Sequence, residues 1–535
     1  MNLNKAFYPF IFSLILASGI YLGYKIQERN ASKNSFFNRA QTGSKLDYIL
    51  GLIEAKYVDT VNTNKLYDDA IAKMLEDLDP HSVYLPPMEM EHETEIMSGN
   101  FEGIGIEFSI QNDTIQVVTP ISGGPSESVG INAGDKIIKI NDTLVAGNGI
   151  TNEMVMKKLK GAKGTKVNVT MLKSGSRKLI TYTIKRDKIP IYSVDAGFMI
   201  DNKTGYIKIN RFSQTTYQEF YEKLELLKKA GIQNLILDLR QNPGGFMDQA
   251  TAIADEFLDG NKTIVYTEGR SMPRTYDKAR TAGLFEQGKL AILIDEGSAS
   301  ASEIVSGAIQ DWDRGILIGR RTFGKGLVQQ EFGLGDGSSL RLTIAKYYTP
   351  SGRSIQRPYD EGTEDYYNNI LMRYKDGEVF NKDSIKQEKK TLYKTLVKGR
   401  TVYGGGGITP DIYIPIDTSM LNPFVNDVLS KGILQEFAYN FFAGNKNLFT
   451  KYNSIAAFNS QYVVNDQLYT QFVDYCKAHD VELKTIQTYA EKSKSFLAFR
   501  LKALFAKQGW KTEGYYQIAI KDDHAVQRAL QEFSK

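Results

Sequence analysis

Mostly apolar segments alternate with amphipathic ones between Gly205 and Arg320. The apolar segments are GYIKINRF, NLILDLR, LAILID and GILIGR, and helical patterns separate them at 216–230, 246–258 and 301–311. Apolar runs of this kind are typical of strands buried on both faces, in a mostly parallel sheet that helices cover. This stretch therefore predicts an α/β fold.

Two glycine- and serine-rich loops follow neighbouring strands of this predicted sheet. RQNPGGF follows NLILDLR, and DEGSASAS follows LAILID. Gly244 and Gly245 let the backbone approach a substrate and present N–H groups, while Ser300 and the Ala301 amide lie at a helix N-terminus, which favours developing negative charge. Two such loops at the same edge of a sheet predict a nucleophilic serine with an oxyanion hole. Taken alone, PGG is better explained as a strand-to-helix turn.

A nucleophilic serine needs a base, and no histidine lies within the α/β segment. The chain has four histidines, all outside it and none at metal-ligand spacing to another: His81, His92, His479 and His524. A histidine-based triad would have to recruit one of them in space. Lys325, in the glycine-flanked FGKGLV, becomes a base near neutral pH only if burial lowers its pKa. Gln329 is placed to orient the amine, and a solvated surface lysine is the ordinary alternative.

Short strands separated by turn residues precede the α/β segment. They run from Phe101 to Arg186, with one helix at 151–159. A glycine-rich loop before an exposed strand supplies backbone N–H groups for a peptide's terminal carboxylate, and the strand edge pairs with the rest of the peptide. Together with GINAGDKI, this segment resembles a PDZ domain, which implies peptide binding at Gly103, Ile104, Gly105 and Ile106. The alternative is that the two glycines serve only a tight turn.

The N-terminal segment predicts a membrane anchor. Ala6–Tyr24 is an uncharged, mostly apolar run of 19 residues, about the length that crosses ~30 Å of hydrocarbon as a helix. A cleaved signal peptide remains the alternative, although Ala17-Ser18-Gly19 is a poor cleavage site. Gly19 and Gly23 have the spacing that packs two such helices together, which leaves homo-oligomerisation open.

The remaining segments carry fewer signals. Leu46–Leu78 has apolar residues at helical spacing and predicts two or three helices, which the turn at Asp79-Pro80 ends. Residues 360–398 are polar and charged and predict an excursion from the sheet. From Leu421 to Lys535 the chain is rich in Phe, Tyr and Leu at helical spacing, which predicts an accessory helical domain.

Composition excludes several classes of protein. A hydrophobic fraction of 42% and a charged fraction of 24% are those of a folded chain. The net charge is +4, and the sequence contains no block of basic residues, so nucleic acid is not an expected partner. The single cysteine, Cys476, rules out an intrachain disulfide and a cysteine-rich metal site.

Six motifs occur in one order between residues 77 and 415. They are DPHSVYL, DLRQNPGG, GSASASEI, FGKGLVQ, YYTPSGRSIQ and GGGGITPDI. Together they resemble the signature of the C-terminal processing (tail-specific) serine peptidases. The resemblance implies an α/β, crotonase/ClpP-like protease core with a PDZ domain inserted ahead of it and no cofactor or metal. It implies Ser300 as nucleophile, Lys325 as general base and Gln329 as its support, with oxyanion donors at Ala301, Gly244 and Gly245.

Two details of this assignment stay open. Ser298 and Ser302 are competing nucleophiles, although the first precedes the helix by two more residues and the second lies inside it. Arg186, in IKRDKI between the PDZ-like strands and the core, is a candidate for coupling peptide binding to activity, and a surface arginine at a linker is the alternative.

The sequence thus predicts five parts and one function. The parts are an anchor with its flank (1–30), a helical region (31–98), a PDZ-like domain (99–187), a protease core (188–420) and a helical domain (421–535). The expected function is that of an inner-membrane-anchored endopeptidase in the periplasm that captures protein tails and cleaves near C-termini. The alternatives are a non-catalytic PDZ scaffold and a crotonase-type acyl-thioester enzyme with the same two-loop oxyanion hole.

Overall fold

The computed structural model describes residues 45–535 apart from 122, 175, 177 and 386–390, and also residues 18, 19, 21 and 25. Most of the anchor predicted at Ala6–Tyr24 lies outside the described residues. Within the described part of the chain, no helix is long and apolar enough to span a bilayer. The anchor therefore stays a prediction.

The predicted protease core is built on a six-stranded sheet, as the alternation of strands and helices predicts. The strand order is β10-β11-β12-β15-β16-β21. Neighbours from β11 to β21 are parallel, and β10 is antiparallel to β11. The strands are β10 (Val194–Met199), β11 (Thr204–Ile209), β12 (Asn234–Asp238), β15 (Lys289–Ile294), β16 (Ile316–Gly319) and β21 (Ile412–Tyr413).

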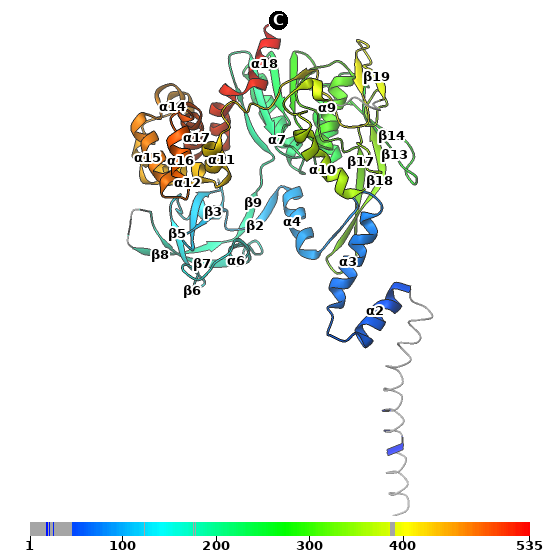
Figure 1. Cartoon of the computed structure of the whole chain (residues 1–535), viewed down its shortest axis with the longest axis horizontal. Helices are drawn as coiled ribbons and strands as arrows, with labels where there is room; N and C mark the ends of the chain where they lie inside the picture. The colour runs from blue at the N-terminus through cyan, green and yellow to red at the C-terminus, as the bar shows by residue number, and fades with distance from the viewer. Residues whose placement is uncertain are drawn as a thin grey trace, which may run out of the picture.

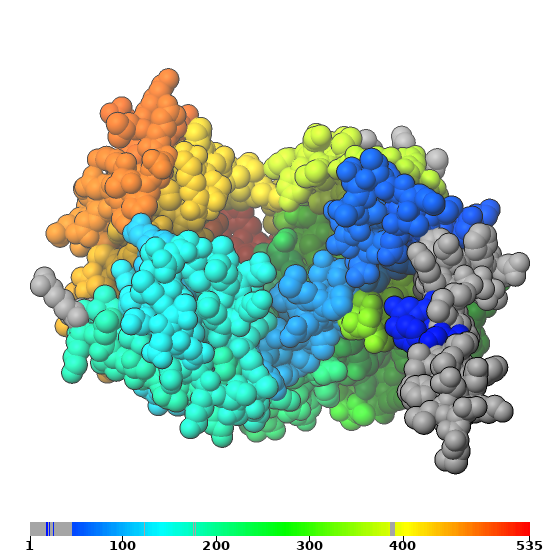
Figure 2. Space-filling view, turned by 90° about the horizontal axis from the view of Figure 1, so that it is seen from below, coloured from blue at the N-terminus to red at the C-terminus, as the bar shows by residue number. Residues whose placement is uncertain are grey.

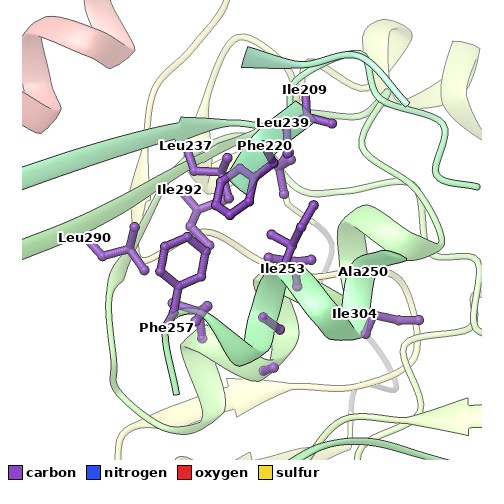
Figure 3. Packing of buried hydrophobic residues seen from close by; sticks show 14 of the residues in the cluster. Ile209, Phe220, Leu237, Leu239, Ala250, Ile253, Phe257, Leu290, Ile292 and Ile304 are labelled. Atoms are coloured by element: carbon purple, nitrogen blue, oxygen red, sulfur yellow. The ribbon is translucent and has the colours of Figure 1, made fainter. Parts of the chain in front are cut away.

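Both faces of this sheet are buried, and successive residues of one strand serve opposite faces. Leu235 and Leu237 of β12 belong to the core beneath the crossover helices, while Ile236 belongs to the core on the other side. Figure 3 shows the first core, where Phe220 and Phe257 pack against strand residues. The crossover helices are α7 (Thr216–Lys229), α8 (Met247–Asp255) and α9 (Ala301–Asp311). Burial on both faces explains why these strands lack polar alternation.

A second sheet joins the N-terminal helices to the core. Its order is β1-β18-β13-β14, with β17 also paired to β18. Because β1 follows the N-terminal helices and pairs with β18, residues 45–98 form part of the protease unit. The elements are α2 (Lys45–Lys56), α3 (Thr63–Glu76), β1 (Val83–Leu85), α4 (Pro87–Ser98), β13 (Thr263–Glu268), β14 (Thr275–Lys278), β17 (Leu327–Gly333) and β18 (Ser339–Tyr348).

The predicted PDZ domain is a separate β-domain with its own core. Its sheet order is β3-β4-β5-β7-β8, and β6 pairs with β5. The chain enters and leaves through the antiparallel pair β2 (Asn100–Gly103) and β9 (Asp187–Pro190). The other elements are β3 (Ile106–Gln111), β4 (Thr114–Pro120), α5 (Pro125–Ser128), β5 (Lys136–Ile140), β6 (Thr143–Leu144), α6 (Asn152–Leu159), β7 (Lys166–Leu172) and β8 (Leu179–Lys185).

The C-terminal helices divide between two cores, which corrects the prediction of a single domain at 421–535. Residues from Phe424 to Ala519 contribute to a helical core of their own. Ile520, Val526 and Phe533 instead cover the second face of the protease sheet. The helices are α11 (Pro423–Ser430), α12 (Ile433–Gly444), α13 (Lys446–Phe449), α14 (Ile455–Gln461), α15 (Asp466–Lys477), α16 (Leu483–Tyr489), α17 (Lys494–Ala519) and α18 (His524–Phe533). Helical spacing reveals a buried face but not which core buries it.

The helical domain also touches the PDZ domain, as Figures 1 and 2 show. The Tyr439 hydroxyl of α12 donates to the Val117 carbonyl of β4, and the Lys446 ammonium donates to the Ala133 carbonyl (3.1 Å). Within α17, Trp510 and Lys511 leave helical geometry, with φ of +60° at Lys511. The helix thus changes direction between the helical domain and the protease core.

The charged segment 360–398 contains a helix that packs against the core. This helix is α10 (Thr363–Lys375), and the strands β19 (Leu392–Lys394) and β20 (Thr401–Tyr403) form a hairpin after it. Tyr366 and Arg373 of α10 are buried.

Candidate active site

Ser300 is the N-cap residue of α9 and has a strained backbone. Its φ is 52° and its ψ is −113°, a region that residues other than glycine rarely adopt and that persists only where the surroundings hold it. The Ser300 N–H donates to Glu303 Oε2 (2.9 Å), and the Ser300 carbonyl accepts from the Glu303 N–H (2.7 Å). Ser300 and Glu303 are the two residues of a capping box, but the Ser300 hydroxyl makes no side-chain cap hydrogen bond. The turn therefore presents a free hydroxyl at the start of a buried helix.

The two neighbouring serines are held by other groups. Ser298 Oγ donates to the Leu239 carbonyl (2.8 Å) and accepts from the Asp295 N–H (2.9 Å). Ser302 Oγ donates to the Asn242 carbonyl (3.0 Å). Both side chains are buried. Their hydroxyls connect the loop that carries Ser300 to the end of β12 and the loop after it, which contains Asn242-Pro243-Gly244-Gly245. Of the three serines, only Ser300 has a hydroxyl without a hydrogen bond to a described residue.

Ser300 and Lys325, 25 positions apart in sequence, are joined through two buried side chains. Glu303 Oε2 accepts from the Ser300 N–H and also from the Lys325 N–H (2.9 Å). The Tyr347 hydroxyl lies between the Ser300 carbonyl, at 3.1 Å, and the Lys325 carbonyl. Both linking side chains are fully buried. The turn at Ser300 and the loop that carries Lys325 are thereby fixed to each other.

The Lys325 ammonium donates to Gln329 Oε1 (2.9 Å), and Gln329 Nε2 donates to the His81 carbonyl (2.7 Å). Burial, with a contribution from the positive charge of Arg341, lowers the pKa of Lys325 to about 8. A lysine with that pKa is substantially neutral near pH 8. No hydrogen bond joins the Lys325 amine to the Ser300 hydroxyl in the described structure, where the amine donates to Gln329 instead.

The three predicted oxyanion donors are not equivalent. No described residue accepts a hydrogen bond from the Ala301 or Gly245 amide, whereas the Gly244 amide donates to Asn242 Oδ1 (2.9 Å). In this conformation the Asn242 side chain occupies the Gly244 N–H, and the role of Gly244 as an oxyanion donor stays a prediction. Gly244 instead permits close approach, since a Cβ there would lie 2.8 Å from the Ser300 Cβ.

Glu303 is a site residue that the sequence analysis missed. It is fully buried, and Oε1 accepts from the Thr322 hydroxyl (2.5 Å) and the Gly324 N–H (2.8 Å), while Oε2 accepts from the two amides described above. Burial raises its pKa to about 7, against these donors, which lower it. The signal was present in the sequence, since Ser300-x-x-Glu303 before an apolar run is the pattern of a helix capping box.

His81 lies close to the lysine although it is distant in sequence from the α/β segment. Its Nε2 is 2.8 Å from the Tyr366 hydroxyl, and burial, reinforced by the Lys325 charge, lowers its pKa to about 3. Asp79 holds the turn by accepting from the His81 N–H (2.8 Å) and the Ser82 N–H (2.9 Å). The histidine ring is thus neutral and engaged with a tyrosine, and its carbonyl supports Gln329.

Helix α10, which lies in the charged segment 360–398, stabilises the loop that carries Lys325. Arg373 donates to the carbonyls of Thr322 (2.8 Å) and Phe323 (3.3 Å), just before Lys325. The Arg357 guanidinium lies 4.1 Å from the centroid of the Phe323 ring and 3.9 Å from that of the Tyr366 ring. The segment that the motifs did not cover therefore supports the candidate base.

The predicted peptide-binding residues line a cavity of the PDZ domain. Its volume is about 270 Å³. The walls include Gly103, Ile104, Gly105 and Ile106, residues of α6, and three residues of α4: His92, Glu95 and Ile96. The walls are mainly apolar, so the cavity suits an apolar side chain.

Arg186 acts within the PDZ domain. Its guanidinium donates to the carbonyls of Leu159 (2.9 Å) and Lys158 (3.0 Å) at the end of α6, and to Thr165 Oγ1 (3.1 Å). Arg186, which directly precedes β9, thus stabilises the C-terminus of α6. Every hydrogen bond that it makes to a described residue stays within the PDZ domain. Its coupling role stays a prediction.

Comparison with known proteins matches most of these parts to families. Peptidase family S41 matches residues 203–365, and a PDZ domain matches 103–184. The activating protease CtpB N-terminal domain matches 14–94, and a family of unknown function, DUF8443, matches 424–511. The last range ends at the irregularity in α17.

Curated relatives match over most of their length. The carboxy-terminal-processing protease of Bartonella bacilliformis is 35% identical over 65% of this chain and 79% of its own length. The carboxy-terminal processing proteases CtpA and CtpB of Bacillus subtilis are 34% and 32% identical, over 66% and 65% of this chain and 75% and 74% of their own lengths.

Among solved structures, the photosystem II D1 C-terminal processing protease matches at 26% identity. The match covers 70% of this chain and 87% of that one, with a TM-score of 0.35. Because that score is low, the family assignment rests on the sequence relatives and on the order of domains. This chain belongs to the carboxy-terminal processing proteases, the PDZ-containing serine peptidases of family S41.

Proposed function

We propose that this protein is an endopeptidase that captures protein substrates by their C-terminal tails and cleaves them near that end with a Ser300–Lys325 dyad. The neutral Lys325 amine takes the Ser300 proton as Oγ attacks the substrate carbonyl. The Ala301 and Gly245 amides then stabilise the oxyanion. The resulting ammonium returns the proton to the leaving amine, and water hydrolyses the acyl-enzyme by the reverse sequence.

The free Ser300 hydroxyl, close to a lysine with a lowered pKa, is the main support for this proposal. Ser300 has a free hydroxyl on a strained turn, while Ser298 and Ser302 are buried and hydrogen-bonded. Lys325 shares two buried anchors with Ser300 and has a lowered pKa. A non-catalytic scaffold would need neither feature.

The cleavage itself is tested with an unstructured protein that ends in apolar residues. We expect mass spectrometry to find new internal cuts toward its C-terminal end, slower cutting when the C-terminus is amidated, and no cuts with Ser300→Ala. Equal cutting by wild type and Ser300→Ala would contradict the proposal, as would equal rates on free and amidated tails.

The rate of cleavage is expected to rise with pH and level off above about pH 8. Lys325 accepts a proton only when neutral, and its pKa is about 8. Below that value each pH unit lowers the neutral fraction, and hence kcat/KM, about tenfold. The measurement is kcat/KM across the pH range, and a flat profile between about pH 6 and 9 would exclude Lys325 as the base.

Replacing Arg341 tests the cause of that pKa. Its positive charge lowers the pKa of Lys325, so Arg341→Gln should move the rise in kcat/KM to higher pH. Arg274→Gln is the matched control, because Arg274 is exposed and pairs with Glu268 on another strand (2.9 Å). An unmoved profile in Arg341→Gln would assign the lowered pKa to burial alone.

We also propose that the protein is anchored in the inner membrane with its catalytic part in the periplasm. The support is the apolar run Ala6–Tyr24. Cell fractionation with protease accessibility tests it: the full-length protein should sediment with inner membranes and be digested only after the outer membrane is opened.

A further inference from the structure

The PDZ cavity is shared between the domain itself and a helix of the protease unit. Helix α4 contributes His92, Glu95 and Ile96 to its wall. In Figure 1, α4 lies between the PDZ domain and the helices near the second sheet. Five residues after Ser98, which ends α4, the chain reaches Gly103 at the end of β2. The helix is therefore placed to affect what enters the cavity.

Lys160 is the charged residue at the glycine loop. It is the C-cap residue of α6, and a Cβ on Gly103 would lie 3.6 Å from its Cα. Its ammonium lies 5.5 Å from the centroid of the Phe101 ring. Both aromatic ring and lysine line the cavity. A cation beside backbone N–H groups and apolar walls matches the terminal carboxylate and apolar side chain of a protein tail.

In this structure the Lys160 ammonium forms an ion pair with Glu95. Its Oε2 accepts from the Lys160 ammonium, and the two side chains are only 18% and 32% exposed. Glu93, on another side of α4, pairs with Arg341 of β18 (2.9 Å). Helix α4 thus places the Glu95 carboxylate at the PDZ cavity and the Glu93 carboxylate against the sheet that carries Gln329.

We infer that Lys160 binds the terminal carboxylate of the substrate tail and that Glu95 is an internal competitor that occupies it in the free protein. This inference rests on the proposed capture of tails by the PDZ domain. Tail binding breaks the Glu95–Lys160 ion pair and forms a carboxylate–Lys160 pair in its place. The domain is therefore selective for a free C-terminus at the cost of lower affinity.

The test measures peptide binding directly, in full-length protein carrying Ser300→Ala so that nothing is cleaved. The probes are a fluorescein-labelled octapeptide ending in three apolar residues with a free carboxylate, and the same peptide amidated. Fluorescence anisotropy gives Kd for each. Lys160→Gln should weaken binding of the carboxylate peptide roughly tenfold or more, as for other hydrogen bonds to charged groups, and leave the amidated peptide unchanged.

Glu95→Gln is expected to have the opposite effect. Without its competitor, Lys160 should bind the carboxylate peptide about two- to fivefold more tightly, the usual range for a partly exposed ion pair. In the Lys160→Gln background the same change should have no effect. Lys160→Arg should preserve the preference for the carboxylate, which separates a charge effect from misfolding.

Matched controls come from the same helices. Lys157→Gln on α6 and Glu91→Gln on α4 remove exposed charges that do not line the cavity, and neither should change Kd. If the parent binds the peptide and Lys160→Gln binds it equally well, this inference is wrong while tail capture stands. If the parent binds neither peptide, tail capture by the PDZ domain fails first.

Discussion

Replacing Ser300 by alanine is expected to lower kcat/KM for peptide cleavage by about 10⁶-fold, the magnitude seen when a nucleophile that acts as part of a unit is removed. The structure gives the reason: the neighbouring serines cannot substitute, since Ser298 and Ser302 are buried and donate to backbone carbonyls. The fold should persist, because the Ser300 hydroxyl makes no hydrogen bond to a described residue.

Lys325→Met should cost at least 10³-fold, and the double variant Ser300→Ala/Lys325→Met little more than Ser300→Ala alone. A base and a nucleophile that act in one step are not additive. Lys346→Met is the matched control, since Lys346 is an exposed lysine on β18 whose Cα pairs with that of Leu327. Rates come from single-turnover cleavage at saturating enzyme. Additive losses would show that the two residues serve separate steps.

Glu303→Ala is expected to have the largest effect on stability. The carboxylate accepts four hydrogen bonds, from Thr322, Gly324, Lys325 and Ser300. Its loss leaves buried donors unpaired, and a few such groups cost roughly 3–5 kcal/mol of unfolding free energy in total. Calorimetry should show a lower Tm for the protease core, and activity should fall because the nucleophile turn loses its tie to the lysine loop.

Two further variants sharpen this prediction. Glu303→Gln keeps the size and one acceptor oxygen but turns an N–H₂ group toward backbone N–H donors, so its stability should lie between those of wild type and Glu303→Ala. Glu361→Ala removes an exposed glutamate and should leave Tm unchanged. A Tm for Glu303→Ala equal to that of wild type would show that the carboxylate is dispensable.

Local sequence patterns predicted the sheet, its covering helices and the two loops at its edge. Strands buried on both faces leave a strong apolar signal, and the Gly244-Gly245 pair marks a close approach that only glycine tolerates. The capping-box pattern at Ser300-x-x-Glu303 is equally local, because its two residues lie three positions apart at a helix start.

The missed parts depend on contacts between distant segments. His81 reaches Gln329 across 248 positions, and Arg373 reaches Thr322 from a segment that looked merely charged. The division of the C-terminal helices between two cores was also invisible, because an apolar helix face does not specify its partner. Gly244 shows what the sequence of a loop leaves undetermined. A glycine indicates backbone conformational freedom, but the Asn242 side chain determines which acceptor its N–H meets.

The central claim is that Ser300 is a nucleophile activated by Lys325, and covalent labelling tests it most directly. The protein is treated with a fluorophosphonate, digested and mapped by mass spectrometry. One adduct is expected, at Ser300, formed faster at pH 9 than at pH 7 and nearly absent in Lys325→Met. An adduct at another serine, or equal labelling of Lys325→Met and wild type, would contradict it.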